Sequence, residues 1–257
     1  MAAVNLAAQV TGDGPPLVIL HGLFGSARNW SSIARRLGDI RQVHALDLRN
    51  HGASPWAERM TYADMAEDVA AYIEGQQLAP ADLLGHSMGG KAAMVLALTR
   101  PELIGRLIVV DIAPVASRGD GFSGIVQALQ GVDPATAQRR TEVDQWLADA
   151  IPEAGLRAFL LQNLVSDDGH LRWRLNLDAI AANMPALTGF PDQAAARYSG
   201  PTTFLAGELS DYLRPRDEPA IHRLFPAARL LEIGQAGHWP HAEQPERFVE
   251  LVRQALA

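Results

Sequence analysis

The strongest indication of the fold is the stretch ADLLGHSMGGKAAMVLALTRP at residues 81–101. Residues 81–86 have the pattern of a short buried strand, and residues 90–100 that of a helix ending before a proline. Between them stands Gly85-His86-Ser87-Met88-Gly89, a G-x-S-x-G sequence. Bulky side chains two positions to either side of the serine would clash with the neighbouring backbone, which accounts for the glycines. The context predicts a nucleophile elbow, in which a strained turn presents the serine at the end of a strand.

Strands and helices alternate outward from this stretch, the pattern of a parallel sheet with crossover helices. Strands are expected at residues 16–22, 42–48, 106–114, 201–208 and 228–235, and helices at 29–38, 61–78, 216–225 and 244–257. The block from 115 to 199 has helical periodicity, frequent Gly and Pro, and no convincing strand. We therefore expect a core of residues 1–114 and 200–257 and an inserted helical cap, or lid, of residues 115–199.

Composition and charge argue against several classes of protein. The 257 residues are 48% hydrophobic and 20% charged, a globular composition with no run near the ~18 apolar residues of a membrane span. The net charge of −7, without a long Lys/Arg run, argues against nucleic-acid binding. The chain has no cysteine, hence no disulfide or thiolate site, and its amino terminus does not resemble a secretory signal. We expect a cytoplasmic protein, monomeric or homodimeric.

A serine hydroxyl needs an adjacent base to become a good nucleophile. His238, in Gly237-His238-Trp239-Pro240, follows the last expected strand. Because loops at the carboxyl ends of parallel strands line the same crevice, His238 and Ser87 should meet at one edge of the sheet. His241 is the alternative base, and His86 is expected to point away and pack.

An acid must orient the histidine, and backbone donors must stabilise the oxyanion. Asp111, at the end of the strand after the serine strand, and Asp211, after the strand at 201–208, both satisfy the position required of the acid. The expected oxyanion donors are the backbone N–H groups of Met88, directly after the nucleophile, and Leu23, in the Gly-rich turn that follows the strand at 16–22.

Five segments together resemble the α/β-hydrolase family, in the family's order: HGLFGSARNW (21–30), DLRNHGASP (47–55), GHSMGGKAAM (85–94), VVDIAP (109–114) and GHWPHAEQPERF (237–248). The insert looks like the cap of YbfF-type bacterial esterases and their mitochondrial relatives. The resemblance implies an α/β fold with a mostly parallel eight-stranded sheet, helices on both faces, and a Ser-His-acid triad without cofactor or metal. Members commonly carry the acid where this chain has Ser210. The YbfF-like branch similarly has serine there and an aspartate in VVDIAP, which favours Asp111 over Asp211.

The combined pattern predicts hydrolysis of small-molecule carboxylic esters, or of thioesters such as acyl-CoA, through an acyl-enzyme on Ser87. Arg172 and Arg174 are candidates for contact with an anionic leaving group. Expected pocket walls are Phe24, Phe122, Phe159, Trp173 and Trp239, with Trp146, Leu160 and Met184 as further lid candidates. The same triad would also suit a perhydrolase or haloperoxidase-like enzyme or a carbon–carbon bond hydrolase, and the fold would suit a non-catalytic ligand receptor.

Overall fold

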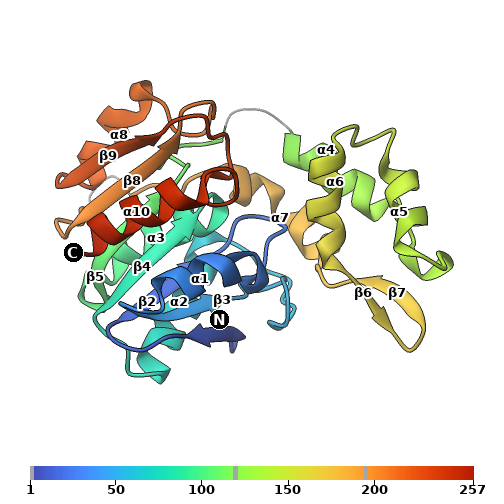
Figure 1. The fold of residues 1–257 in the computed structure, drawn as a ribbon, viewed down its shortest axis with the longest axis horizontal. Helices are drawn as coiled ribbons and strands as arrows, with labels where there is room; N and C mark the ends of the chain where they lie inside the picture. Colours follow the sequence, from blue (N-terminus) through green and yellow to red (C-terminus); the bar gives the residue numbers. More distant parts are fainter. Residues whose placement is uncertain (1–2, 118–120, 194–195) are drawn as a thin grey trace.

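A sheet of seven strands forms the centre of the protein (Figure 1). The computed structural model describes residues 3–117, 121–193 and 196–257. β1 runs antiparallel to β3, and every other neighbouring pair in this sheet is parallel. In spatial order the strands are β1 (Ala8–Thr11), β3 (Gln42–Leu46), β2 (Pro16–Leu20), β4 (Ala81–His86), β5 (Ile104–Val110), β8 (Thr202–Gly207) and β9 (Ala228–Ile233).

The six strands expected from the sequence are confirmed, and all six are parallel. The expected number of eight strands is wrong, since the sheet in the described residues has seven. On the β3 side, the sheet ends at one antiparallel strand, β1. The chain turns from this strand into β2 through Gly12 and Gly14, which have φ values of 81° and 112°.

Helices cover both faces of the sheet, as expected. Because side chains along a strand alternate between faces, the residues of β2 divide between two cores. Leu17 and Ile19 pack in the cluster with α1 and α10, while Val18 and Leu20 pack in the cluster with α2, α3 and α8. The bounds are α1 (Ser31–Leu37), α10 (Pro245–Leu256), α2 (Tyr62–Gly75), α3 (Met88–Thr99) and α8 (Glu218–Leu224).

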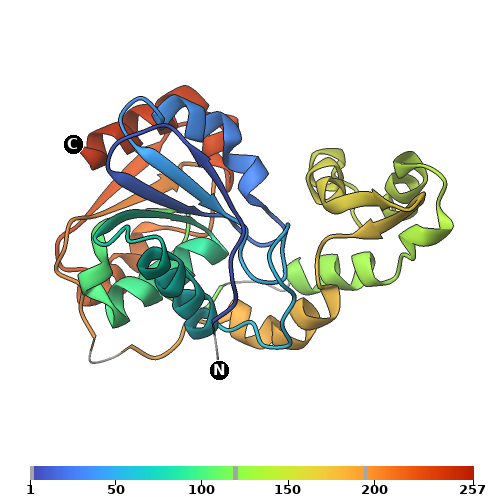
Figure 2. The same cartoon turned by 90° about the horizontal axis from the view of Figure 1, so that it is seen from below.

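The segment between β5 and β8 forms a separate lobe beside the sheet (Figures 1 and 2). Its main elements are α4 (Gly121–Gln130), α5 (Arg140–Leu147), α6 (Ala154–Leu160), β6 (Leu164–Asp167), β7 (His170–Trp173) and α7 (Leu177–Thr188). Both views place α7 between the lobe and the core. We refer to this lobe as the cap. Its expected bounds of 115–199 stay a prediction, and residues 118–120 and 194–195 within them lie outside the described residues.

The cap contains a β-hairpin, so the expectation of a purely helical cap without strands is wrong. β6 pairs with β7 in antiparallel register, with Leu164 opposite Trp173. The hairpin turns at Asp168 and Gly169, whose φ values are 46° and 85°. Two successive positive φ values are typical of the tight turn that Asp-Gly favours. The Asp-Gly pair at 168–169 therefore indicates a hairpin in the sequence itself, but the flanking segments have helical periodicity, which led to the expectation of helix throughout.

Strand register places the carboxyl ends of β4, β5 and β8 side by side. His86 lies opposite Val110 in the ladder, so the residues that follow them, Ser87 and Asp111, emerge next to each other. The backbone N–H of Ser87 donates to Val110 O at 3.0 Å, and that of Asp111 donates to Leu205 O at 2.8 Å. The sheet itself therefore fixes the positions of the predicted nucleophile and one candidate acid.

Candidate active site

Ser87 occupies the turn between β4 and α3 in a strained conformation, with φ 52° and ψ −118°. A Cβ atom on Gly85 would lie 2.3 Å from Gly89 O, and one on Gly89 would lie 2.5 Å from His21 O. Neither contact is sterically possible, so the turn requires glycine at both positions, as the sequence interpretation expected. The tight turn holds the serine at the end of the strand, directly before the first turn of α3.

The loop between β9 and α9 (Pro240–Glu243) brings His238 against Ser87. His238 Nε2 lies 3.0 Å from Ser87 Oγ, and His238 Nδ1 lies 2.7 Å from Asp111 Oδ2. A carboxylate can only accept, so Nδ1 carries the ring proton and Nε2 is left to accept the proton of the serine hydroxyl. Three segments far apart in the sequence thus form one chain of hydrogen bonds, the geometry that activates a serine nucleophile.

The carboxylate of Asp111 is fully buried and completely engaged. Its Oδ1 accepts the backbone N–H of Gly207 at 3.0 Å, and its Oδ2 accepts the hydroxyl of Ser210 as well as the ring N–H of His238. Tyr212 stacks on the imidazole of His238, with ring centroids 4.0 Å apart. Together these contacts fix both the carboxylate and the ring that it orients.

Asp211, the alternative acid, lies outside this arrangement. Its side chain is 85% exposed and pairs with Arg214 at 2.9 Å. Its neighbour Ser210, at the position where the resemblance places the acid of other members, donates its hydroxyl to Asp111 instead. The structure brings Asp111 to the histidine and leaves Asp211 in solvent.

Two further histidines lie beneath His238, and burial lowers the pKa of each. His86 donates its Nε2–H to the backbone carbonyl of His238 at 2.7 Å, so it supports the loop rather than the serine. His241, the alternative base, stacks on Trp30 with ring centroids 4.3 Å apart, and desolvation lowers its pKa to about 3. Both rings are therefore neutral near pH 7, and neither takes the place of His238 beside Ser87.

The two predicted oxyanion donors lie next to the serine. Met88 begins α3, where the first N–H groups have no acceptor within the helix. Leu23 lines the same cavity as Ser87, in a turn closed by a bond from Gly25 N to Gly22 O of 2.9 Å. These positions are compatible with an oxyanion hole made from two backbone N–H groups.

The part of the chain that the structure describes holds no group of three or more His, Cys, Asp or Glu side chains suited to a metal ion. Likewise, no helix among the described residues is both long and apolar enough to cross a bilayer.

Comparison with known proteins identifies the family. The model of the Alpha/beta hydrolase family matches residues 17–251. The sn-1-specific diacylglycerol lipase ABHD11 of Mus musculus is 42% identical, over 95% of this chain and 81% of the relative. Esterase YbfF of Escherichia coli is 34% identical, over 97% of this chain and 96% of the relative. A solved structure, a marine microorganism esterase, superposes with a TM-score of 0.94 at 41% identity, covering 98% of this chain and 99% of the other.

The chain belongs to the alpha/beta hydrolase family.

In this alpha/beta hydrolase, Ser87 and His238 face a cavity of about 270 Å³ between core and cap. Four of the five predicted pocket residues line it: Phe24, Phe122, Phe159 and Trp239. The fifth, Trp173, lies in a separate surface pocket with Leu129 and Leu171, so it does not border Ser87 in this structure. Among the further lid candidates, Met184 lines a small hollow that also borders Ser87, Leu160 is fully buried, and Trp146 is 46% exposed.

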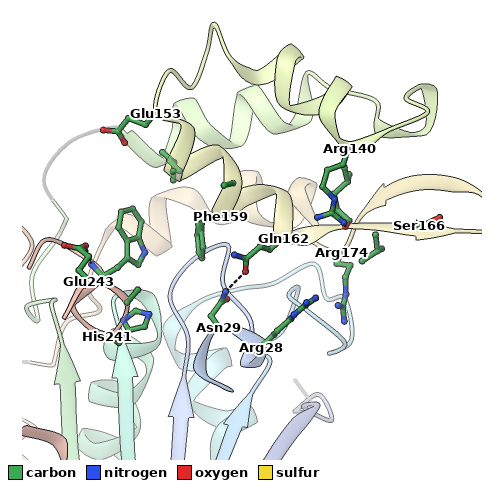
Figure 3. Close-up of a pocket in the computed structure, with 17 residues that line it drawn as sticks. Arg28, Asn29, Arg140, Glu153, Phe159, Gln162, Ser166, Arg174, His241 and Glu243 are labelled. Atoms are coloured by element: carbon green, nitrogen blue, oxygen red, sulfur yellow. Dashed lines mark hydrogen bonds between the residues drawn. The ribbon is translucent and has the colours of Figure 1, made fainter. Parts of the chain in front are cut away.

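A larger groove of about 1350 Å³ continues outward from the cavity (Figure 3). The cavity and the groove have five lining residues in common: Asn29, Leu156, Phe159, Trp239 and His241. A hydrogen bond of 2.7 Å from Asn29 of the core to Gln162 of the cap spans the groove. A ligand that reaches Ser87 from this side therefore passes between core and cap.

Sequence reasoning missed the residues that hold the Leu23 turn. Phe24 has a φ of 63°, its N–H donates to His51 Nε2 at 3.2 Å, and its carbonyl accepts from Asn163 of the cap at 2.7 Å. His51 Nδ1 in turn donates to the carbonyl of Arg49, whose guanidinium forms a buried ion pair with Asp68 at 2.6 Å. These partners come from three separate segments, around residues 49–51, 68 and 163, and no spacing in the sequence connects these segments.

Lys91, the only lysine of the chain, joins the two ends of the cap to α3. Its ammonium group donates to Ser117 Oγ at 3.0 Å, to Thr188 O at 3.3 Å and to Gly189 O at 2.7 Å. Burial lowers the pKa of Lys91 to about 8. The lysine thus holds the segments that leave and re-enter the core, one helical turn after Ser87.

Proposed function

We propose that this alpha/beta hydrolase is a serine esterase that works through an acyl-enzyme on Ser87. The chain is a carboxylic ester hydrolase, since relatives named as esterases or a lipase match almost its whole length. The observation that supports the mechanism most directly is the chain of bonds from Ser87 Oγ through both ring nitrogens of His238 to Asp111.

In the first step His238 Nε2 takes the hydroxyl proton while Ser87 Oγ attacks the acyl carbonyl. The oxyanion accepts the N–H groups of Leu23 and Met88. The tetrahedral intermediate then collapses, the alcohol leaves with the proton from His238, and the acyl group remains on the serine. Water enters, loses its proton to His238 and attacks the acyl-enzyme, which releases the carboxylic acid and restores Ser87.

The cavity favours an apolar substrate next to the ester. Aromatic and aliphatic side chains dominate its wall, including Phe24, Ile125, Leu156 and Phe159. Acylglycerols are candidate substrates because one relative is named as a diacylglycerol lipase. Thioesters such as acyl-CoA stay in the proposal, because the same attack and the same oxyanion contacts serve a thiol leaving group.

A substrate panel on wild type and Ser87→Ala tests this proposal. We expect hydrolysis of short 4-nitrophenyl esters by the wild type, and a loss of about 10⁴-fold or more in Ser87→Ala, as for serine hydrolases in general. A fluorophosphonate probe should label the wild type and the control Ser31→Ala, whose serine begins α1 and lines neither the cavity nor the groove, but not Ser87→Ala. An unlabelled, inactive wild type would instead favour a non-catalytic receptor.

A cytoplasmic location and a monomeric or homodimeric state remain predictions of the sequence. Gel filtration of the purified protein and fractionation of expressing cells would test them directly.

A further inference from the structure

The groove outside the active-site cavity is divided by charge. Three arginines, Arg28, Arg140 and Arg174, and two glutamates, Glu153 and Glu243, line it. Figure 3 shows the three arginines on one side, beyond Gln162, and the two glutamates on the opposite side, beyond Phe159, with Glu243 near His241 and Glu153 on the cap. A positive end is notable in a chain whose net charge is −7, because the average surface of such a protein repels anions.

The arginines at this end keep their charge available. Within the described ranges, no carboxylate pairs with Arg28 or Arg174. Arg140 donates to the backbone carbonyls of Leu161 and Leu164 at 2.6 Å each, and these neutral acceptors hold the guanidinium in place without cancelling its charge.

Arg172 shows the contrast on the same segment of chain. It lies two residues before Arg174, and its guanidinium pairs with Asp167 at 2.6 Å. It is also absent from the residues that line the groove. Of the two arginines that the sequence offered for an anionic leaving group, only Arg174 therefore lies at the groove, and Arg28 and Arg140 join it there.

One of the two glutamates at the other end has a structural role. Glu243 accepts the N–H groups of Gly237 at 2.6 Å and Trp239 at 3.1 Å, and so fixes the loop that carries His238. Glu243 thus supports the catalytic loop, while the charge of the three arginines at the opposite end is available to a ligand.

We propose that Arg28, Arg140 and Arg174 bind an anionic group, a phosphate or a carboxylate, on the leaving-group part of the substrate. This inference rests on the proposed esterase function. The hollow lined by Met184 and Leu187 measures about 20 Å³ and has room for little more than a water molecule. The apolar cavity of about 270 Å³ beside Ser87 has room for a short acyl group, so the groove is left to the alcohol or thiol. Guanidinium groups match phosphate and carboxylate oxygens in geometry as well as in charge.

Two series of butyrate monoesters of α,ω-alkanediols test the proposal. In one series the far end of the diol carries a phosphate, in the other a free hydroxyl, and the length of the diol linker varies within each series. The measured quantity is the ratio of kcat/KM for the anionic ester to that for the neutral ester at each linker length. We expect the ratio to exceed one, to peak at the length that spans from Ser87 to the arginines, and to fall toward one in 0.5 M salt, where ion pairs are screened.

The variants Arg28→Gln and Arg174→Gln should each lower this ratio by about two- to fivefold, the effect of losing one exposed ion pair. Arg172→Gln is the matched control and should leave the ratio unchanged. A ratio of one at every linker length, or an equal ratio in the Arg28→Gln/Arg174→Gln double variant, would overturn the inference. In either case hydrolysis of the neutral ester would leave the esterase function standing, whereas an enzyme inactive on both esters would refute that function first.

A further experiment distinguishes binding of a soluble anionic substrate from binding of an anionic lipid surface. Sedimentation with phosphatidylglycerol vesicles, compared with phosphatidylcholine vesicles, measures surface binding. Vesicle binding that depends on Arg28 and Arg174, without any effect of these arginines on the soluble ester ratio, would also contradict the proposal. Binding confined to the soluble phosphate ester supports it.

Discussion

Replacing Asp111 by asparagine should inactivate the enzyme, although it changes few atoms. In the wild type, Asp111 Oδ1 accepts from Gly207 N and Oδ2 accepts from His238 Nδ1 and Ser210. An amide has one oxygen and one NH₂ group, so it can satisfy only one of these two sides as an acceptor.

Each orientation of the new amide has a different cost. With its oxygen toward Gly207, the NH₂ group faces His238 Nδ1, which must then accept and lose its proton to Nε2. A protonated Nε2 in the neutral ring cannot take the proton of Ser87, and this wrong tautomer is associated with a loss of about 10⁴-fold in kcat. With the amide turned over, its NH₂ group faces the N–H of Gly207. Two buried donors then face each other without an acceptor, which lowers stability by roughly 1–3 kcal/mol.

The assay compares kcat for a short 4-nitrophenyl ester among wild type, Asp111→Asn and Asp211→Asn. The Asp211 side chain is 85% exposed and forms a surface ion pair with Arg214, so Asp211→Asn should change kcat by less than about twofold. Thermal unfolding of each variant separates loss of chemistry from loss of fold. A large loss in Asp211→Asn together with nearly normal turnover in Asp111→Asn would refute the assignment of the acid.

Three further predictions concern the surroundings of the site. Asn163→Ala removes the hydrogen bond from the cap to the Phe24 carbonyl and should lower kcat by roughly tenfold or more, with a smaller effect on KM, since misplaced oxyanion donors act mainly on the transition state. The kinetic control is Asn183→Ala, because Asn183 also bridges cap and core but does not contact this turn. Asp68→Asn breaks a buried ion pair and should lower the free energy of unfolding by about 3–5 kcal/mol in urea titrations, and a change below 1 kcal/mol would contradict that reasoning. The pKa of His241 is lowered from 6.5 to about 3, so between these pH values the ring is neutral in the folded protein while the unfolded chain binds a proton. The contribution of His241 to the free energy of unfolding is therefore complete above pH 6.5 and is lost as the pH falls toward 3. His241→Phe should reduce the fall of the unfolding free energy by up to about 1.4 kcal/mol per pH unit in that window, and an unchanged slope would show that His241 does not cause the fall.

The strands and the elbow could be predicted because their signals are local. Buried runs such as 16–22 and 81–86 are continuous in sequence, and the glycines around Ser87 follow from the steric demands of one turn. The strand count could not be derived in the same way. It came from resemblance, and the described residues form seven strands with β1 as the only antiparallel one in the sheet.

The supports of the oxyanion turn could not be predicted, because they depend on contacts between segments. Asn163 reaches Phe24 across 139 positions of sequence, and His51 reaches it across 27. An asparagine or a histidine at either position has no local pattern that distinguishes it from a surface residue. Only the docking of the cap onto the core gives these side chains a partner, so their role becomes visible with the tertiary structure.

The choice between the two acids shows where sequence reasoning reaches its limit. β5 and β8 are neighbours in the sheet, about 5 Å apart, so a carboxylate at the end of either strand begins at a similar distance from His238. What decides is the direction in which the chain leaves each strand. Asp111 leaves β5 with a φ of 51°, and its side chain is held inward by Gly207 and Ser210. One position beyond Ser210 the chain has turned, so Asp211 extends into solvent. The serine at the position usual for the acid thus serves the aspartate on the adjacent strand, and moving a carboxylate to residue 210 without removing Asp111 would place two buried negative charges beside one imidazole.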